Sequence, residues 1–269
     1  MADHWKIIRH VKRLPKLTGP VFIEGLPGIG NVGKITVDYL IDELKAKKLY
    51  SFFSYTFPHS VFVNEHNLVE LPSISMYYVK TKGKARDYLF LAGDIQPTDE
   101  TSSYMFCEII LEMLKEAGCK EIVTIGGIGL IDIPKEPGLY CTANSKDIIK
   151  RFQKHGKINN KIYGVIGPII GVTGVLVGMA QEYDIEAISL LAETFGHPMH
   201  LGIKGSREIL KVLKRRFRLS INLKHLDSEV AKIEKELIRR KEEIMSISEQ
   251  SAMNKACSKL DNDEAHYIG

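Results

Sequence analysis

The sequence has little cysteine and no strong excess of charge of either sign. Its four cysteines in 269 residues are Cys107, Cys119, Cys141 and Cys257. No two of them form a CxxC pair, so the spacing suggests neither a zinc site nor a disulfide framework. Free thiols in a chain of this size are typical of a reducing cytosol. The 37 basic and 33 acidic residues leave a net charge of +4, and so mild an excess does not by itself indicate nucleic-acid binding.

The chain also lacks a recognisable targeting segment. Charged and polar residues surround Trp5, so the N-terminus has no apolar signal core. One uncharged stretch, residues 162–181, has about the length of a membrane-spanning helix, and its recurring glycines would suit helix packing in a membrane. Pro168 and the glycines interrupt it, however. We therefore expect a buried strand at 162–166, a turn, and a packed helix from about Val172.

Apolar runs rich in β-branched and aromatic residues alternate with helical patterns. Strands are expected at 21–24, 49–55, 74–81, 88–92, 122–125, 140–143, 162–166 and 186–191. Helices are expected at 34–44, 98–117 and 145–153. A fourth should begin at about 172, and a fifth should run from a cap at Ser206 to about 217. Gly126, Gly127 and Gly129 read as a turn after the fifth strand. The alternation predicts a three-layer α/β/α sandwich with a mainly parallel sheet.

The C-terminal part changes character after an α/β domain at 1–220. Apolar residues then recur at heptad positions, namely Leu223, Leu226, Val230, Ile233, Leu237, Ile244 and Ile247. Arg240 is the one polar residue at such a position. Six acidic and six basic residues between 224 and 243 flank this narrow apolar seam. The pattern predicts a coiled-coil-like helical arm at 221–252 that binds a second copy or a neighbouring helix. An amphipathic helix lying on its own domain is the alternative. Residues 253–269 read as a flexible tail.

A glycine-rich loop follows the first expected strand and precedes a helix. Its residues of interest are Gly25, Gly28, Gly30, Gly33 and Lys34. Residues 28–33 spell G-x-G-x-x-G, but no Asp or Glu stands between Glu43 and Glu65 to hold a ribose. The loop also approaches a P-loop, yet Ile35 occupies the place of the magnesium-binding Ser or Thr. We expect these glycines to serve tight turns and packing. A phosphate site in a nucleotide-binding enzyme remains the alternative.

Other chemistry-bearing residues form no clear constellation. His197 and His200 flank Pro198, which argues against a metal pair on a helix. The acids near expected strand ends are Asp94, Asp99, Glu100 and Asp132, and no spacing singles out an acid–base pair. Residues 204–224 contain eight basic residues and one acid. This stretch favours an acidic protein partner or simple solubility over nucleic acid. We therefore predict no catalytic residues, no metal and no cofactor.

Several motifs in order resemble one family. They are 25–33 (GLPGIGNVG), 58–59 (PH), 93–97 (GDIQP), 126–129 (GGIG), 167–174 (GPIIGVTG) and 190–194 (LLAET). Their order and spacing, over about residues 5–240, resemble the proteasome assembly chaperone family, and its archaeal members most closely.

The resemblance implies a non-catalytic protein with a fold similar to the nucleoside phosphorylases. It also implies homo-oligomers and, as partners, proteasome α subunits or related chaperone subunits. Some members bind α subunits through a C-terminal tail that ends in a hydrophobic residue, tyrosine and any residue. This chain ends His266, Tyr267, Ile268 and Gly269, so its tyrosine is third from the end where the family motif has it second. The expected contact residues are this tail and the heptad seam.

Overall fold

The computed structural model describes residues 5–63, 66–81, 86–164, 167–224 and 226. The chain divides into two units, Met1–Asn222 and Leu223–Gly269, and the architecture below is that of the first. Within the described residues, no helix combines the length and the apolar character needed to cross a membrane.

The first unit is built on an eight-stranded sheet in the order β1-β3-β6-β7-β2-β8-β10-β9. Its strands are β1 (Trp5–Arg9), β2 (Val21–Gly25), β3 (Lys47–Ser54), β6 (Ile74–Val79), β7 (Tyr88–Gly93), β8 (Glu121–Leu130), β9 (Leu139–Ala143) and β10 (Glu186–Phe195). A separate two-stranded hairpin pairs β4 (Phe62–Val63) with β5 (Val69–Glu70). The helices are α1 (Val32–Glu43), α2 (Glu100–Glu116), α3 (Lys146–Gln153), α4 (Val172–Met179) and α5 (Ile203–Phe217), with short 3-10 turns η1 (Ile29–Asn31) and η2 (Ala180–Tyr183).

Parallel pairing is confined to the centre of the sheet. Strands β7, β2, β8 and β10 pair in parallel, whereas β1, β3 and β6 on one side and β9 on the other pair antiparallel. The α/β class predicted from the sequence is confirmed, and the sheet is mixed. Central parallel strands are apolar on both sides because helices cover both faces, and every residue of β2 is buried.

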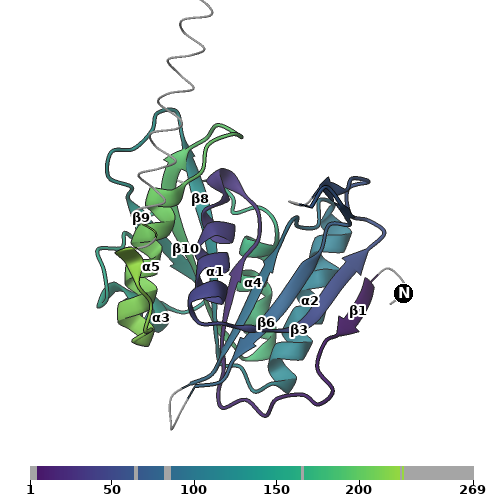
Figure 1. Ribbon diagram of the computed structural model, residues 1–269. Coiled ribbons are helices and arrows are strands. Elements are labelled where there is room, and N and C mark those ends of the chain that lie inside the picture. The colour runs from purple at the N-terminus through teal and green to yellow at the C-terminus, as the bar shows by residue number, and fades with distance from the viewer. Residues whose placement is uncertain (1–4, 64–65, 82–85, 165–166, 225, 227–269) are drawn as a thin grey trace, which may run out of the picture. The chain divides into compact units, whose positions relative to one another are not determined.

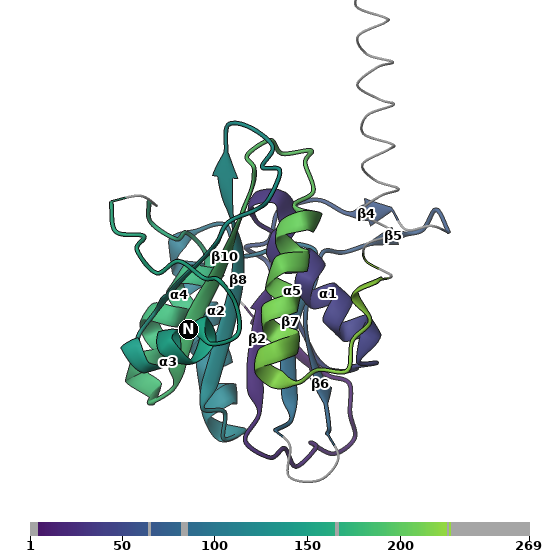
Figure 2. The ribbon, with the colours of Figure 1, turned by 90° about the vertical axis from the view of Figure 1, so that its left-hand side faces the viewer.

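Helices α1 and α5 lie on one face of the sheet, and α2 and α4 lie on the other (Figures 1 and 2). On the α2 face, Phe22, Phe52 and Leu91 of the sheet meet Phe106 and Ile110 of the helix, all with no exposed surface. Burying each such side chain stabilises the fold by roughly 1.5–3 kcal/mol. The carboxyl ends of the parallel strands therefore stand on a rigid core, and the glycine loop lies at that end.

Three sequence-based expectations about elements are wrong. Residues 162–164, the described part of the strand expected at 162–166, form a loop and a turn, and Tyr163 is fully exposed, while β9 occupies the place beside β10. The glycines at 126–129 do not form a turn but continue β8, which pairs with β10 up to Leu130. Ser206 lies inside α5, where its hydroxyl donates to the carbonyl oxygens of Val32 and Gly202.

Candidate functional site

The glycine loop, residues 25–34, runs from the end of β2 through η1 into α1. A Cβ atom added at Gly25 would lie less than 3.0 Å from the carbonyl oxygen of Gly33. One added at Gly33 would lie equally close to the carbonyl oxygen of Ile125 in β8. Side chains have no room at these two positions, because β2, α1 and β8 approach one another backbone to backbone. Gly25 and Gly33 therefore serve close packing of the helix on the sheet.

The middle of the loop is held against the end of β10. Gly30 has a φ of 61°, in the left-handed region, and a Cβ there would lie 2.7 Å from the Thr194 hydroxyl oxygen. The backbone N–H of Gly202, just before α5, donates to the Gly30 carbonyl oxygen at 2.7 Å. Gly28 differs from the other three, because nothing lies within 4 Å of a Cβ added there.

Lys34 is committed to neighbours other than the loop amides. Its ammonium donates to the Gly93 carbonyl oxygen at 3.0 Å and pairs with Asp38 at 3.0 Å, while Asp94 stands 4.0 Å away. A P-loop lysine must instead reach the phosphates that the loop cradles. Lys34 would have to leave the end of β7 to do so. In this structure it ties α1 to that strand.

A buried carboxyl group that sequence reasoning missed lies beside the loop. Glu24, on β2, has no exposed surface. It accepts hydrogen bonds from the Leu26 backbone N–H at 2.9 Å and from the Thr173 hydroxyl at 3.2 Å. Burial raises the pKa of Glu24 from 4.5 to about 7, although these hydrogen bonds oppose the shift. The sequence signal for this buried acid is a glutamate within the otherwise apolar run of residues 21–25.

Gln96 extends this polar network across the carboxyl ends of the strands. Its amide nitrogen donates to the Pro27 carbonyl oxygen at 2.7 Å, and its amide oxygen accepts from the Val172 N–H at 3.3 Å. The network thus joins the glycine loop to the first residue of α4. A general acid or base must come within hydrogen-bond reach of its substrate, and Glu24 is sealed from solvent. Its contacts assign it to holding the loop and α4 together.

Asp94, Asp99, His197 and His200 serve local structure, whereas Asp132 is exposed after the end of β8. Asp99 caps α2 by accepting from the Ser102 N–H at 2.9 Å, which lowers the pKa of Asp99. Asp94 accepts from the Ser73 N–H at 3.2 Å. The rings of His197 and His200 pack against Phe195, with centroids 5.7 and 5.6 Å away. Among the described residues, no three metal-ligating side chains form a group that could hold an ion.

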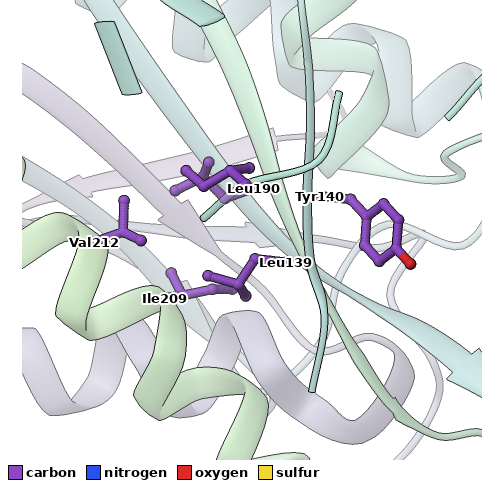
Figure 3. A pocket seen from close by; sticks show the side chains of 6 residues that line it. Leu139, Tyr140, Leu190, Ile209 and Val212 are labelled. Carbon is purple, nitrogen blue, oxygen red and sulfur yellow. The ribbon is translucent and has the colours of Figure 1, made fainter. Parts of the chain in front are cut away.

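A small pocket opens between α5, β9 and β10 (Figure 3). Its lining comprises Leu139, Tyr140, Ile158, Leu190, Ile209 and Val212. The lining is almost wholly apolar, and the space between the side chains is too narrow for a water molecule. Cofactor pockets span hundreds of Å³ and carry convergent polar groups. This pocket is therefore a packing gap and not a ligand site.

Apolar side chains are instead exposed on loops and on the β4–β5 hairpin. The residues with more than two fifths of their surface exposed include Ile29, Phe62, Val63, Leu68, Val69, Leu71, Ile131, Ile133, Ile170 and Met199. Scattered exposed apolar residues are normal, but an isolated two-stranded hairpin with apolar residues on both strands is marginal in water on its own. Such surfaces suit contact with another protein.

The predicted contact residues lie mostly outside the described part of the chain. Of the heptad set, the structure describes Leu223 and Leu226, both with helical backbone. The others, Val230, Ile233, Leu237, Ile244 and Ile247, lie outside the described residues, as do the tail residues His266, Tyr267, Ile268 and Gly269. The coiled-coil arm and the tail remain predictions.

The fold and the packed loop define an α/β domain with a mixed sheet between two layers of helices. The sequence profile of the PAC2 family matches residues 22–240, and the chain belongs to this family. An uncharacterised protein of Methanocaldococcus jannaschii, MJ1210, is 26% identical over 263 residues, which are 98% of this chain and 97% of the relative.

Solved structures extend the comparison. Pyrococcus furiosus PbaB, described as an archaeal proteasome activator, is 32% identical with a TM-score of 0.80, over 89% of this chain and 99% of PbaB. Pyrococcus furiosus PbaA, an archaeal homolog of proteasome-assembly chaperone, has a TM-score of 0.71 at 23% identity, over 99% of this chain and 100% of PbaA. At 23% identity, the likeness to PbaA shows a shared fold. The resemblance to the proteasome assembly chaperone family is thereby confirmed.

Proposed function

We propose that the chain is a non-catalytic chaperone or scaffold that works in the cytoplasm by binding proteasome α subunits. The observation that carries this proposal is its likeness to PbaB, at 32% identity over nearly the whole of that protein. PbaB is described as a proteasome activator, which requires contact with the proteasome. The heptad arm and the tail at 266–269 are the proposed contact elements, and a second copy of the chain is a proposed partner of the arm.

The geometry of the loop supports a binding role over an enzymatic one. Gly25 and Gly33 face backbone atoms, Lys34 points to the end of β7, and the buried Glu24 cannot reach a substrate. These are the groups on which a nucleotide-dependent mechanism would draw. Their engagement in packing supports the proposal that the chain acts through protein–protein contact.

A capture experiment tests the proposal. The full chain and a variant lacking residues 255–269 are each mixed with purified proteasome α subunits, and the bound fraction is measured. We expect the full chain to retain α subunits and the truncated chain to retain fewer. If neither form retains them, the assignment to α subunits is wrong.

A thermal-shift assay tests the enzyme alternative in parallel. Any ligand that binds the native state stabilises it and so raises its melting temperature. At a concentration of a hundred times the Kd, the stabilisation is about 2.7 kcal/mol. ATP, NAD and nucleosides should leave the melting temperature unchanged. A rise with one of them would favour a ligand site at the glycine loop.

A further inference from the structure

The free edge of β1 is exposed, basic and partly apolar. Strand β1 is the first in the sheet order, and within the described sheet it pairs with β3 alone, at the margin seen in Figure 1. The N–H of His10 donates to the Leu49 carbonyl oxygen at 2.9 Å. In an antiparallel strand, the backbone N–H and C=O groups of every second residue point to the partner strand. Those of Lys6 and Ile8 therefore also point to β3. The backbone groups of Ile7 and Arg9 therefore point out from the sheet.

Apolar surface accompanies these free backbone groups. Ile7 is 44% exposed and Ile8 is 56% exposed, and they present side chains on opposite faces of the strand. Helix α2 lies under one face, where Trp5 stacks on Phe106 with ring centroids 4.7 Å apart. Partly buried Ile109 and Met113 follow Phe106 along the same side of α2. A strand added next to β1 would find apolar neighbours on both of its faces.

The charge along β1 and the segment that follows it has one sign, although the acid Glu116 of α2 lies near Tyr50, the β3 partner of Arg9. Residues 6–16 include five exposed cations and no acid: Lys6, Arg9, Lys12, Arg13 and Lys16. None of the five forms an ion pair with a described acidic residue. Charged residues on an edge strand commonly serve to prevent sheet-to-sheet aggregation. Two neighbouring exposed isoleucines work against that purpose, and the cations continue well past the end of the strand.

We propose that β1 is a docking edge for an extended, acidic segment of a protein partner, which adds to the sheet as an antiparallel or parallel strand. Backbone hydrogen bonds to Ile7 and Arg9 would give affinity, and the five cations would select acidic side chains. Two copies of the chain would bring two basic strips together, so self-pairing at this edge is disfavoured. The inference rests on the proposed function, because it names a surface and a partner chemistry for protein binding.

A labelled peptide of alternating glutamate and valine is the probe, and fluorescence anisotropy measures its binding to the full chain. We expect Ile7→Pro to weaken binding about tenfold, because it removes the outward N–H without removing a bond to β3. The double variant Lys12→Glu, Arg13→Glu should weaken it by a similar factor. Lys154→Glu with Lys157→Glu changes the net charge equally on exposed residues elsewhere and should have no effect. Unfolding curves establish that each variant is folded.

The outcomes separate this inference from the proposed function. No binding of the acidic peptide, or equal binding of a lysine–valine peptide, would overturn the docking edge even if α subunits are still captured. Unchanged binding by the charge-reversed and proline variants would overturn it as well. Tighter binding of a single-stranded DNA oligonucleotide, lost in the charge variant and kept in Ile7→Pro, would show a nucleic-acid surface instead. If the unmodified chain binds the acidic peptide and both the proline and the charge-reversed variants lose that binding, the inference is supported. This holds even if α subunits are not captured.

Discussion

Replacing Gly33 with alanine tests the packing role of the glycine loop. The added Cβ would lie less than 3.0 Å from the Ile125 carbonyl oxygen, a distance that real Cβ atoms do not reach. Ile125 lies in the central strand β8, whose neighbours β2 and β10 hold it in place. The contact is therefore relieved only by moving α1 away from the sheet.

The expected loss follows from two opposing effects. Overpacking of a rigid core costs about 1–3 kcal/mol, and a clash with backbone belongs at the upper end. Alanine is favoured over glycine in a helix by about 1 kcal/mol, which offsets part of the loss. The net destabilisation should be about 2 kcal/mol, or a melting temperature lower by about 4–8 °C for a domain of this size.

Gly28→Ala is the matched control in the same loop. Nothing lies within 4 Å of its added Cβ, and its φ of −163° is extended backbone that any residue adopts. Thermal and urea unfolding of both variants, followed by circular dichroism, should show a loss for Gly33→Ala and none for Gly28→Ala. Equal stability of Gly33→Ala and the unmodified chain would refute the packing argument. An equal loss in both variants would also contradict it.

Two further predictions concern buried charge. The pKa of Glu24 is raised from 4.5 to about 7 in the folded protein, so between these pH values the native state keeps a proton that the unfolded chain has released. The free energy of unfolding should therefore fall as pH rises through this window, by about 3 kcal/mol in all, and level off above it. Glu24→Gln should flatten urea-unfolding stability against pH, and an unchanged slope would show that Glu24 titrates normally. Glu121, with 6% of its side chain exposed, pairs with Arg86 and Arg216, so Glu121→Ala should cost about 2 kcal/mol by stranding Arg216. The half-exposed pair of Glu186 and Arg151 is the comparison, where Glu186→Ala should cost less than about 1 kcal/mol, and the reverse ranking would contradict the burial argument.

The sequence predicted the elements whose pattern is local. The continuous apolar run at 88–92 and the long periodicity of 98–117 became β7 and α2 with nearly the expected bounds. The edge strand β9 and the Ser145-capped helix α3 were also found. Strong periodicity and caps carry their information within a few residues, so tertiary contacts are not needed to recognise them.

The misses depend on contacts between distant segments. Strand β1 reads as a charged segment because only its pairing with β3 makes it a strand. Gly127 looked like a turn, yet it is glycine because the Ile29 carbonyl oxygen lies where its Cβ would be. The buried Glu24 depends on Thr173, which is 149 positions away. Pattern reasoning cannot place these partners, and the arm and tail remain predictions from heptads and resemblance.

Light scattering coupled to size exclusion tests the central claim most directly, namely that this protein works by binding proteasome α subunits. The purified full-length chain is measured alone, α subunits alone, and then the two together. The account predicts a new species in the mixture, with a mass equal to a sum of both components and with both chains present in the peak. Two peaks at the separate masses, at concentrations well above micromolar, would contradict it.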